Sequence, residues 1–369
     1  MKTFTTGELI MKRTALTIAI SSLLLAGGVQ ASTVYNQDGA TLNIGGRVQA
    51  MYYGTEDDTV DSDQSFLRLK VDGEARVNEE IVGYGQFQYQ VVTNGGDSEL
   101  RQAFAGIKHE RFGNLSFGRQ NGLVTKVVND FTDVLPEFGG DGLGKTSEAF
   151  GTGRTSNLVQ YFYTTDGLVL GGQYTGENHA QNGYVKNPGS EADAGNWRKG
   201  SDEGYALSAA YNFDMGLSLA AVHNQAGKTS VQEKYADFGG SEDAKLTVVG
   251  GMYKANGLYT AASFGYGENQ VFANGGYVAE SRGLEAVVQY ELGKWKPSLA
   301  WINLNVEDDS QNIDGALKNY VSIGTWYYFN KNFDMFVEYK LNLLDGSDGK
   351  TSLGQSTDDT VAIAMQYWF

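Results

Sequence analysis

The feature that most constrains this chain is an alternation of apolar and polar side chains with a period of two. Between residues 66 and 77, leucine, valine, glycine and alanine hold the odd positions. The even positions carry five charged side chains: Arg68, Lys70, Asp72, Glu74 and Arg76. A helix would scatter these two sets around its circumference, whereas a strand places them on opposite faces. Residues 284–292 and 361–369 repeat the pattern.

Sixteen segments of this kind follow one another along the chain. They cover residues 41–53, 66–77, 81–92, 99–109, 114–120, 157–164, 167–175, 203–213, 216–226, 245–254, 257–268, 279–292, 296–305, 319–330, 333–343 and 358–369. Very short turns alternate with longer, polar and acidic connections, which places the long loops at one end of the sheet. An even number of strands with this arrangement is typical of membrane barrels. We therefore predict an all-β fold, a 16-stranded antiparallel transmembrane β-barrel with long external loops.

The period also predicts which face of each strand meets which solvent. Outside such a barrel the solvent is lipid, so the apolar set faces outward. The charged set then faces the lumen, and sixteen strands enclose a lumen wide enough for water. A soluble sheet would need further layers to cover sixteen apolar faces, and no amphipathic helix is visible in the sequence.

The first 31 residues have the pattern of a secretory leader. Lys12 and Arg13 precede an apolar run of about twelve residues, which is too short to span a bilayer, and small residues end the segment at Ala31. We expect cleavage after Ala31 and translation from Met11 rather than from Met1. The remaining chain, residues 32–369, forms one barrel domain.

The charge balance argues against nucleic acid as a partner. The leader contains three of the 28 basic and one of the 44 acidic residues, so the remaining chain has a formal net charge of −18. Proteins that bind nucleic acid present a basic patch instead. Acidic residues gather in the connections, as in Glu56-Asp57-Asp58 and from Asp345 onward. We expect weakly held divalent ions there that bridge to lipopolysaccharide phosphates.

One segment matches a nucleotide-binding motif. Residues 139–146 read GGDGLGKT, which fits the phosphate-binding loop, with Lys145 and Thr146 at its diagnostic positions. That loop needs a buried strand before it and a helix after it. Here two acids and a proline precede the motif, and a short glycine-rich stretch follows it. We therefore expect no nucleotide.

Catalytic and metal-binding patterns are missing from the sequence. The chain has no cysteine and three histidines, His109, His179 and His223, none of them in a recognisable motif with a serine or carboxylate. The stretch from Asp345 superficially resembles a calcium loop but lacks the glutamate at its twelfth position. We expect no enzyme, no cofactor and no dedicated metal site.

Several motifs carry a family resemblance. They are Val34-Tyr35-Asn36-Gln37-Asp38-Gly39, Gly83-Tyr84-Gly85-Gln86, Arg101-Gln102-Ala103-Phe104-Ala105-Gly106, Pro136-Glu137-Phe138-Gly139-Gly140-Asp141, Tyr328-Phe329-Asn330-Lys331-Asn332 and the closing strand from Asp358 to Phe369. On these residues the chain resembles the trimeric general porins of Gram-negative outer membranes, over essentially all of residues 32–369.

The resemblance implies a site. The third long connection, residues 121–156, would fold into the barrel, and its length alone marks it as functional. It implies an acidic side of a pore constriction at Asp133, Glu137 and Asp141. On the facing wall it implies a basic side at Arg47, Arg68 and Arg101. Further basic residues of the lumen are Arg119, Lys145 and Arg154, and the terminal Phe369 would be read by the barrel-assembly machinery.

The implied function is a non-specific diffusion porin of the outer membrane. Such a channel is filled with water, passes ions and small hydrophilic solutes, and assembles as a homotrimer among lipopolysaccharide and outer-membrane lipid. The acidic balance predicts a preference for cations. A solute-specific channel is the alternative, and it would show a ladder of aromatic side chains along the lumen.

Two departures from the family pattern concern the loops. The stretch from Asp141 to Arg154 is shorter, so one expected wall arginine has no certain counterpart; Lys145 or Arg154 would replace it. The second long connection, Thr93 to Ser98, is very short, which puts in doubt a contact that relatives make with the neighbouring subunit.

Overall fold

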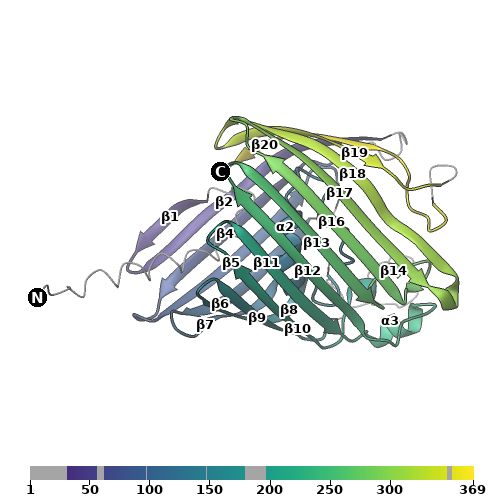
Figure 1. The fold of residues 1–369 in the computed structure, drawn as a ribbon. Coiled ribbons are helices and arrows are strands. Elements are labelled where there is room, and N and C mark those ends of the chain that lie inside the picture. Colours follow the sequence, from purple (N-terminus) through teal and green to yellow (C-terminus); the bar gives the residue numbers. More distant parts are fainter. Residues whose placement is uncertain (1–30, 56–61, 97, 147, 179–196, 347–350) are drawn as a thin grey trace, which may run out of the picture.

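Sixteen antiparallel strands close into one barrel. The computed structural model describes residues 31–55, 62–96, 98–146, 148–178, 197–346 and 351–369. The barrel strands are β2 (Ala40–Thr55), β4 (Phe66–Arg76), β5 (Ile81–Val92), β6 (Glu99–His109), β7 (Gly113–Asn121), β8 (Arg154–Thr165), β9 (Leu168–Thr175), β10 (Gly204–Asn212), β11 (Leu217–Ala226), β12 (Ala244–Ala255), β13 (Leu258–Glu268), β16 (Glu280–Tyr290), β17 (Trp295–Asp308), β18 (Ile313–Asn330), β19 (Phe333–Asn342) and β20 (Thr360–Trp368). Each pairs with its neighbours in the sequence, and β2 closes the ring by pairing with both β4 and β20 (Figure 1).

Two short strands extend the sheet beside β2. The strand β1 (Ser32–Gln37) pairs with the first residues of β2, where β20 has ended, and β3 (Ser62–Asp63) pairs with its last residues. At the junction of β1 and β20, Gly46 and Phe369 exchange backbone hydrogen bonds of 3.0 and 3.1 Å. A side chain on Gly46 would meet the ring of Phe369 and the backbone of Arg68, so a glycine at this position leaves room for the terminal aromatic.

All sixteen predicted strands are confirmed, with boundaries that differ by up to six residues. The largest difference concerns the predicted long connection after residue 305. Instead β17 and β18 continue to Asp308 and from Ile313, and the 3-10 turn η3 (Asp309–Gln311) joins them. Their inner faces pack on a neighbouring loop through an apolar cluster that includes Val271, Val306 and Ile313, which explains why the strands extend.

The predicted faces are also confirmed. In β20, Ile363, Met365 and Tyr367 are about half exposed on the outside, while the alternating residues Ala362 and Ala364 are buried on the inside. The same alternation holds in β16. Because an exposed apolar band is stable only against lipid, the outer surface is built for a membrane.

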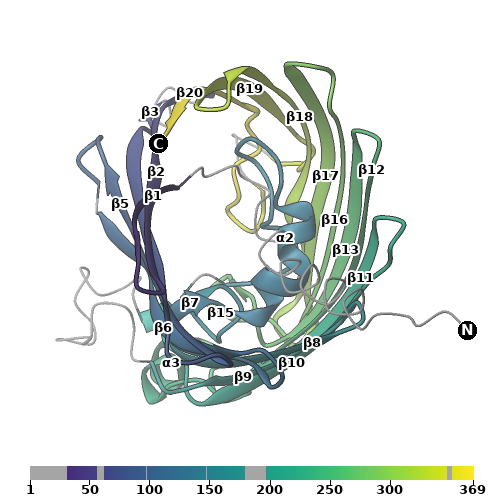
Figure 2. The same cartoon turned by 90° about the vertical axis from the view of Figure 1, so that its left-hand side faces the viewer.

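The third long connection lies inside the barrel. We call residues 122–153 loop 3; it contains the π-helical turn η1 (Val124–Asn129) and the short helix α2 (Asp130–Thr132). Viewed along the barrel, α2 lies within the ring of strands, and it contacts β12, β13 and β16 (Figure 2). Apolar residues of the loop, Leu123, Val124, Val127, Val128, Phe131, Val134 and Leu143, share one core with the inner wall. The loop therefore lies against the inner wall and narrows the lumen.

Glycines allow the loop to lie directly on the wall. A side chain on Gly283 of β16 would overlap the carbonyl of Gly142, and one on Gly265 of β13 would come within 2.6 Å of the Leu143 carbonyl. Gly140 and Gly144 have φ angles of +68° and +73°, which other residues adopt only with strain. The segment GGDGLGKT is thus the part of loop 3 that docks on β13 and β16, and its glycines serve close packing.

The remaining elements lie at the end of the barrel opposite β1 (Figure 1). They are the 3-10 turn η2 (Trp197–Lys199), the helix α3 (Ser230–Tyr235) and the hairpin of β14 (Phe272–Ala273) and β15 (Gly276–Tyr277). Phe150 of loop 3 contacts this group through Tyr277, at 5.7 Å between ring centroids. Across the described residues, every helix is too short or too polar to cross a membrane.

The close contact at Gly283 makes a prediction about stability. We expect Gly283→Ala to lower the midpoint of thermal unfolding in detergent, because overpacking against a backbone atom costs about 1–3 kcal/mol. The matched control is Gly172→Ala, since a side chain there would meet nothing within 4 Å. Displacement of loop 3 should also expose Lys145 to trypsin in the folded barrel. Equal midpoints and equal cleavage of the two variants would contradict the docking.

Candidate pore constriction

The acidic side of the candidate constriction lies on loop 3. Asp133 ends α2 and is exposed to the lumen, and Glu137 follows Pro136 at the next bend of the loop. Glu137 accepts a hydrogen bond from the Tyr53 hydroxyl of β2. Glu137 also interacts electrostatically with Arg47 and Arg68, and Asp133 with Lys145 of its own loop and, more weakly, with Arg101. The structure thus brings these predicted acids within range of the predicted arginines.

Asp141 has a different environment from the other two acids. Its carboxylate accepts from Lys318 Nζ at 2.5 Å and from the Tyr320 hydroxyl at 2.8 Å, both on β18. An acid paired with a lysine adds little net charge to the lumen. Asp141 therefore fastens loop 3 to the wall, and Asp133 and Glu137 remain as the carboxylates that face the arginines.

Two wall carboxylates hold the backbone of loop 3. Glu338 of β19 accepts from the amides of Glu137 and Phe138 at 2.6 and 3.1 Å, and from the Ser322 hydroxyl. Glu285 of β16 accepts from the amide of Gly142 at 2.6 Å and from the Thr132 hydroxyl. Charge-assisted bonds of this kind are stronger than neutral ones. They satisfy backbone donors that the irregular loop leaves without a helix or sheet partner.

The basic side begins with Arg47 of β2 and Arg68 of β4. Their guanidinium carbons lie 4.9 and 4.8 Å from the ring centroid of Phe66, which is almost fully covered. Arg68 donates to the Gln90 side chain at 2.9 and 2.5 Å. Arg47 donates to the amide oxygen of Gln366 at 3.0 Å when that amide is oriented to satisfy both of its atoms. Aromatic and amide partners fix both side chains but leave their charges uncancelled.

Arg101 reaches the lumen through a bulge in β6. The register with β5 shifts between Gln88 and Tyr89, so Arg101 and the adjacent Gln102 both point inward. Bulges commonly redirect a side chain in this way. Arg101 donates to Gln88 at 3.0 Å and pairs with Glu99 at 2.8 Å.

Of the three further basic residues, Arg154 alone belongs to the arginine wall. It begins β8 and pairs with Glu99 at 3.1 Å. Arg119 is only 7 % exposed and forms two 2.7 Å bonds with Glu148, so it presents no open charge to the lumen. Lys145 lies on the acidic side instead, where Asn129 accepts from its Nζ at 3.0 Å.

Five residues at the site escaped the sequence interpretation. They are Tyr53, Glu99, Glu285, Lys318 and Glu338. A signal existed for Tyr53, Glu285 and Glu338, because each has the inward parity of its predicted strand, but inward parity alone does not separate a loop anchor from a solvated side chain. Lys318 lies one residue before the predicted strand 319–330 and had no assigned parity. Glu99 begins its strand, and a short loop precedes it, so its parity was uninformative.

The described histidines and acidic residues form no metal site. Among the described residues, no three histidine or acidic side chains gather closely enough to hold a metal ion. His109 lies near Glu80 at 3.5 Å, and His223 shares a hydrogen bond with Thr247. His179, the acidic residues 56–58 and 61, and residues 347–350 lie outside the described part of the chain.

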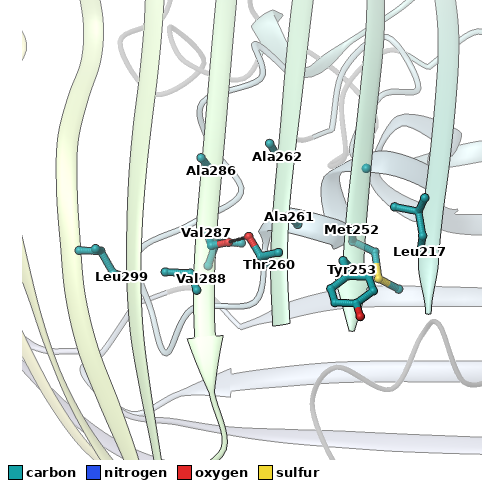
Figure 3. Close-up of a pocket in the computed structure, with 11 residues that line it drawn as sticks. Leu217, Met252, Tyr253, Thr260, Ala261, Ala262, Ala286, Val287, Val288 and Leu299 are labelled. Atoms are coloured by element: carbon teal, nitrogen blue, oxygen red, sulfur yellow. Dashed lines mark hydrogen bonds between the residues drawn. The ribbon is translucent and has the colours of Figure 1, made fainter. Parts of the chain in front are cut away.

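An apolar pocket lies outside the lumen. It measures about 470 Å³ and lies between the outward residues Leu217, Tyr253, Val288 and Leu299 of β11, β12, β16 and β17 (Figure 3). Small residues, Ala262 and Ala286, form its floor. The pocket faces the membrane side of the wall and has no part in the constriction.

The bonds to Glu338 predict how firmly loop 3 is held. We expect Glu338→Ala to loosen the Glu137 end of the loop, because it leaves two amides and a hydroxyl without their acceptor, at about 1.5–3 kcal/mol for each charge-assisted bond. The matched control is Glu338→Gln, whose side-chain oxygen still accepts. Single-channel recordings should show larger current fluctuations in the alanine variant than in the glutamine variant. Identical records from both variants and the unmodified protein would contradict the anchoring role.

Comparison with known proteins agrees with this architecture. The Gram-negative porin family model matches residues 37–369. Outer membrane porin C of Enterobacter cloacae is 35 % identical, with 97 % of this chain and 100 % of the relative covered. A putative outer membrane porin protein, NmpC, of Escherichia coli is 34 % identical over 96 % of this chain and 99 % of the relative.

A solved structure extends the agreement to the fold. Salmonella typhi OmpF, in a complex with daunomycin, superposes with a TM-score of 0.81 at 27 % identity and covers 92 % of this chain and 100 % of its own. Both the family match and the relatives span nearly the whole barrel. The chain belongs to the Gram-negative porin family, and it forms a β-barrel diffusion channel of the outer membrane.

Proposed function

We propose that this porin is a general diffusion channel that prefers cations, with selectivity set largely at loop 3. The observation that carries the proposal is the arrangement of Asp133 and Glu137 on loop 3 opposite arginines of the wall. Glu137 interacts with Arg47 and Arg68 without a direct ion pair, and Asp133 is exposed to the lumen. Opposed charges that remain apart create a field across the lumen, which screens solutes by charge and polarity.

The charge balance supports the cation preference. The chain without its leader has a net charge of −18. At the waist, Arg101 and Arg154 both pair with Glu99, and Arg119 is buried against Glu148. Arg47 and Arg68 are therefore the described wall arginines of the site without a paired carboxylate. Fixed negative potential raises the local cation concentration over a screening length of about 8 Å at physiological ionic strength.

The lining of the waist supports a general rather than a solute-specific channel. Beside the arginines, β5 and β6 present glutamines to the lumen: Gln86, Gln88, Gln90 and Gln102. Phe66, an aromatic residue of this wall, is covered by the two arginines and offers no open face for stacking. Amides hydrogen-bond many polar solutes without selecting one.

Neutralising the two loop acids tests the proposed selectivity. We expect Asp133→Asn with Glu137→Gln to shift the reversal potential in a potassium chloride gradient toward that of an anion-preferring pore. The shift should shrink in molar salt, where the screening length falls to about 3 Å. Arg68→Ser should act in the opposite direction and deepen the cation preference. Unchanged selectivity of the double variant at low salt would show that Asp133 and Glu137 do not set the field.

Assembly as a homotrimer is part of the proposal. The outer faces of β2, β4 and β5 combine apolar residues with small ones that keep the surface flat, such as Gly46, Gly73, Gly83 and Gly85. In the short second loop, Thr93 and Asn94 hydrogen-bond Ser65 and Asp63 of the same chain. The flat strand faces would then supply most of the contact between subunits.

Electrophoresis tests the assembly. We expect the unheated protein to migrate as an oligomer in detergent and as a single chain after boiling, since the contact involves folded barrel surface. Val48→Lys, which places a charge on the exposed outer face of β2, should weaken the oligomer, and Leu207→Lys on the far side of the barrel serves as the control. A monomeric mass for the unmodified protein in mild detergent would contradict a trimer.

The proposal includes three further points: processing, assembly and lipid contact. The leader is removed after Ala31, ahead of β1. The assembly machinery reads Phe369, which ends the last strand beside Gly46. Lipopolysaccharide contacts the acidic rim of the external end through divalent ions.

A further inference from the structure

A glutamate interrupts the basic wall of the pore. Glu99 is the first residue of β6, and its carboxylate lies 2.8 Å from Arg101 Nη1 and 3.1 Å from Arg154 Nη2. Its side chain is 32 % exposed, compared with 21 % for Arg101 and 16 % for Arg154. Of these three charged groups, the carboxylate is thus the one most open to the water of the lumen.

Glu99 belongs to a chain of alternating charges. Arg154 also lies 3.3 Å from Glu148, and Glu148 holds Arg119 through two 2.7 Å bonds. The order is Arg119, Glu148, Arg154, Glu99 and Arg101. Three positive and two negative charges leave a single positive charge for the whole row, so most of the positive charge of its three arginines is cancelled.

The buried and the open members of this row have different roles. Glu148 is 4 % exposed and connects loop 3 to β7, so its removal would leave a buried arginine without its partner. Glu99 lies at the lumen surface, where Arg101 also donates to the side-chain amides of Gln88 and Gln90, and Arg154 also contacts Glu148. Its removal changes the field in the pore without leaving a fully buried charge.

We propose that Glu99 is a selectivity-determining residue that extends the cation path from loop 3 onto the basic wall. The inference rests on the proposed function, in which fixed charges at the waist set ion preference. A cation that passes the waist then meets carboxylates on both sides, Asp133 and Glu137 on the loop and Glu99 on the wall. Among the described wall arginines, Arg47 and Arg68 face anions there without a paired carboxylate.

The test compares two glutamates of the same barrel. Glu74 also faces the lumen, but it pairs with Lys108 and lies outside the alternating row. Glu99→Gln and Glu74→Gln each remove one negative charge, so the change in net charge is the same. We expect Glu99→Gln to lower the potassium-to-chloride permeability ratio by up to about tenfold at low salt, because one unit charge about 6 Å away in water changes the local concentration of each ion about threefold and in opposite directions. Glu74→Gln should change it far less.

A second pair of variants keeps the test independent of how well Glu99→Gln assembles. Arg101→Gln alone should raise the cation preference, and adding Glu99→Gln to it should return the permeability ratio toward that of the unmodified protein. All variants are measured as heat-modifiable oligomers in planar bilayers at low and molar salt. The inference is overturned if Glu99→Gln and Glu74→Gln give equal shifts, or if Glu99→Gln changes nothing in the Arg101→Gln background.

The tests of Glu99 can fail or succeed independently of the proposed function. An unmodified pore without cation preference would contradict that function, whereas the role of Glu99 is judged by differences between variants. A large shift from Glu99→Gln in a pore that prefers anions would support the inference and reject the proposed preference.

Discussion

The docking of loop 3 on the inner wall is the constraint on which the rest of the pore depends. An irregular segment inside a barrel must satisfy its backbone donors and acceptors within the protein or with water. Here Glu338 and Glu285 accept from three of its amides, and Tyr259 and Gln289 donate to the carbonyls of Phe131 and Val134 at 2.6 Å. Glycines on both surfaces bring the backbones together. Without these contacts the loop would have no fixed distance to the arginines.

The loop and the wall hold their unpaired charged side chains in place with different partners. On loop 3, Asp141 forms an ion pair with Lys318 and anchors the loop, whereas the carboxylates of Asp133 and Glu137 face the lumen. On the wall, amides and an aromatic ring position Arg47 and Arg68 without neutralising them. Carboxylates position Arg101, Arg119 and Arg154 and neutralise them in part. The number of arginines in the sequence therefore overstates the positive charge of the wall.

Much of the fold was predictable because a strand has a fixed period and a membrane reverses the usual pattern of burial. The sixteen strands and their lipid faces follow from that period, and the inward position of loop 3 came from the family resemblance. The bulge at Arg101 was not predictable, because a one-residue shift leaves no mark in the alternation. Neither was the pairing of Glu99 with Arg154, since the two residues are 55 positions apart.

One sequence feature could have located the inserted loop: apolar residues on the inner face of the wall. In β11 and β12, Ala220, Val222, Leu246 and Val248 face inward although they are apolar, so both faces of these strands are apolar. In a water-filled barrel such a patch needs a cover, and loop 3 is that cover. A polar inner face on one half of the barrel and an apolar one on the other half thus indicates where an inserted loop lies.

The central claim is that loop 3 forms the narrowest part of the lumen. Its most direct test is the size limit of the pore, measured by the partition of neutral polymers of increasing radius during single-channel recording. The account predicts a small limit for the unmodified protein and a much larger one when residues 123–150 are replaced by a short glycine linker. Because the strands remain, the variant should still insert and conduct. An unchanged size limit in a folded, conducting variant would contradict the account, since the constriction would then lie elsewhere.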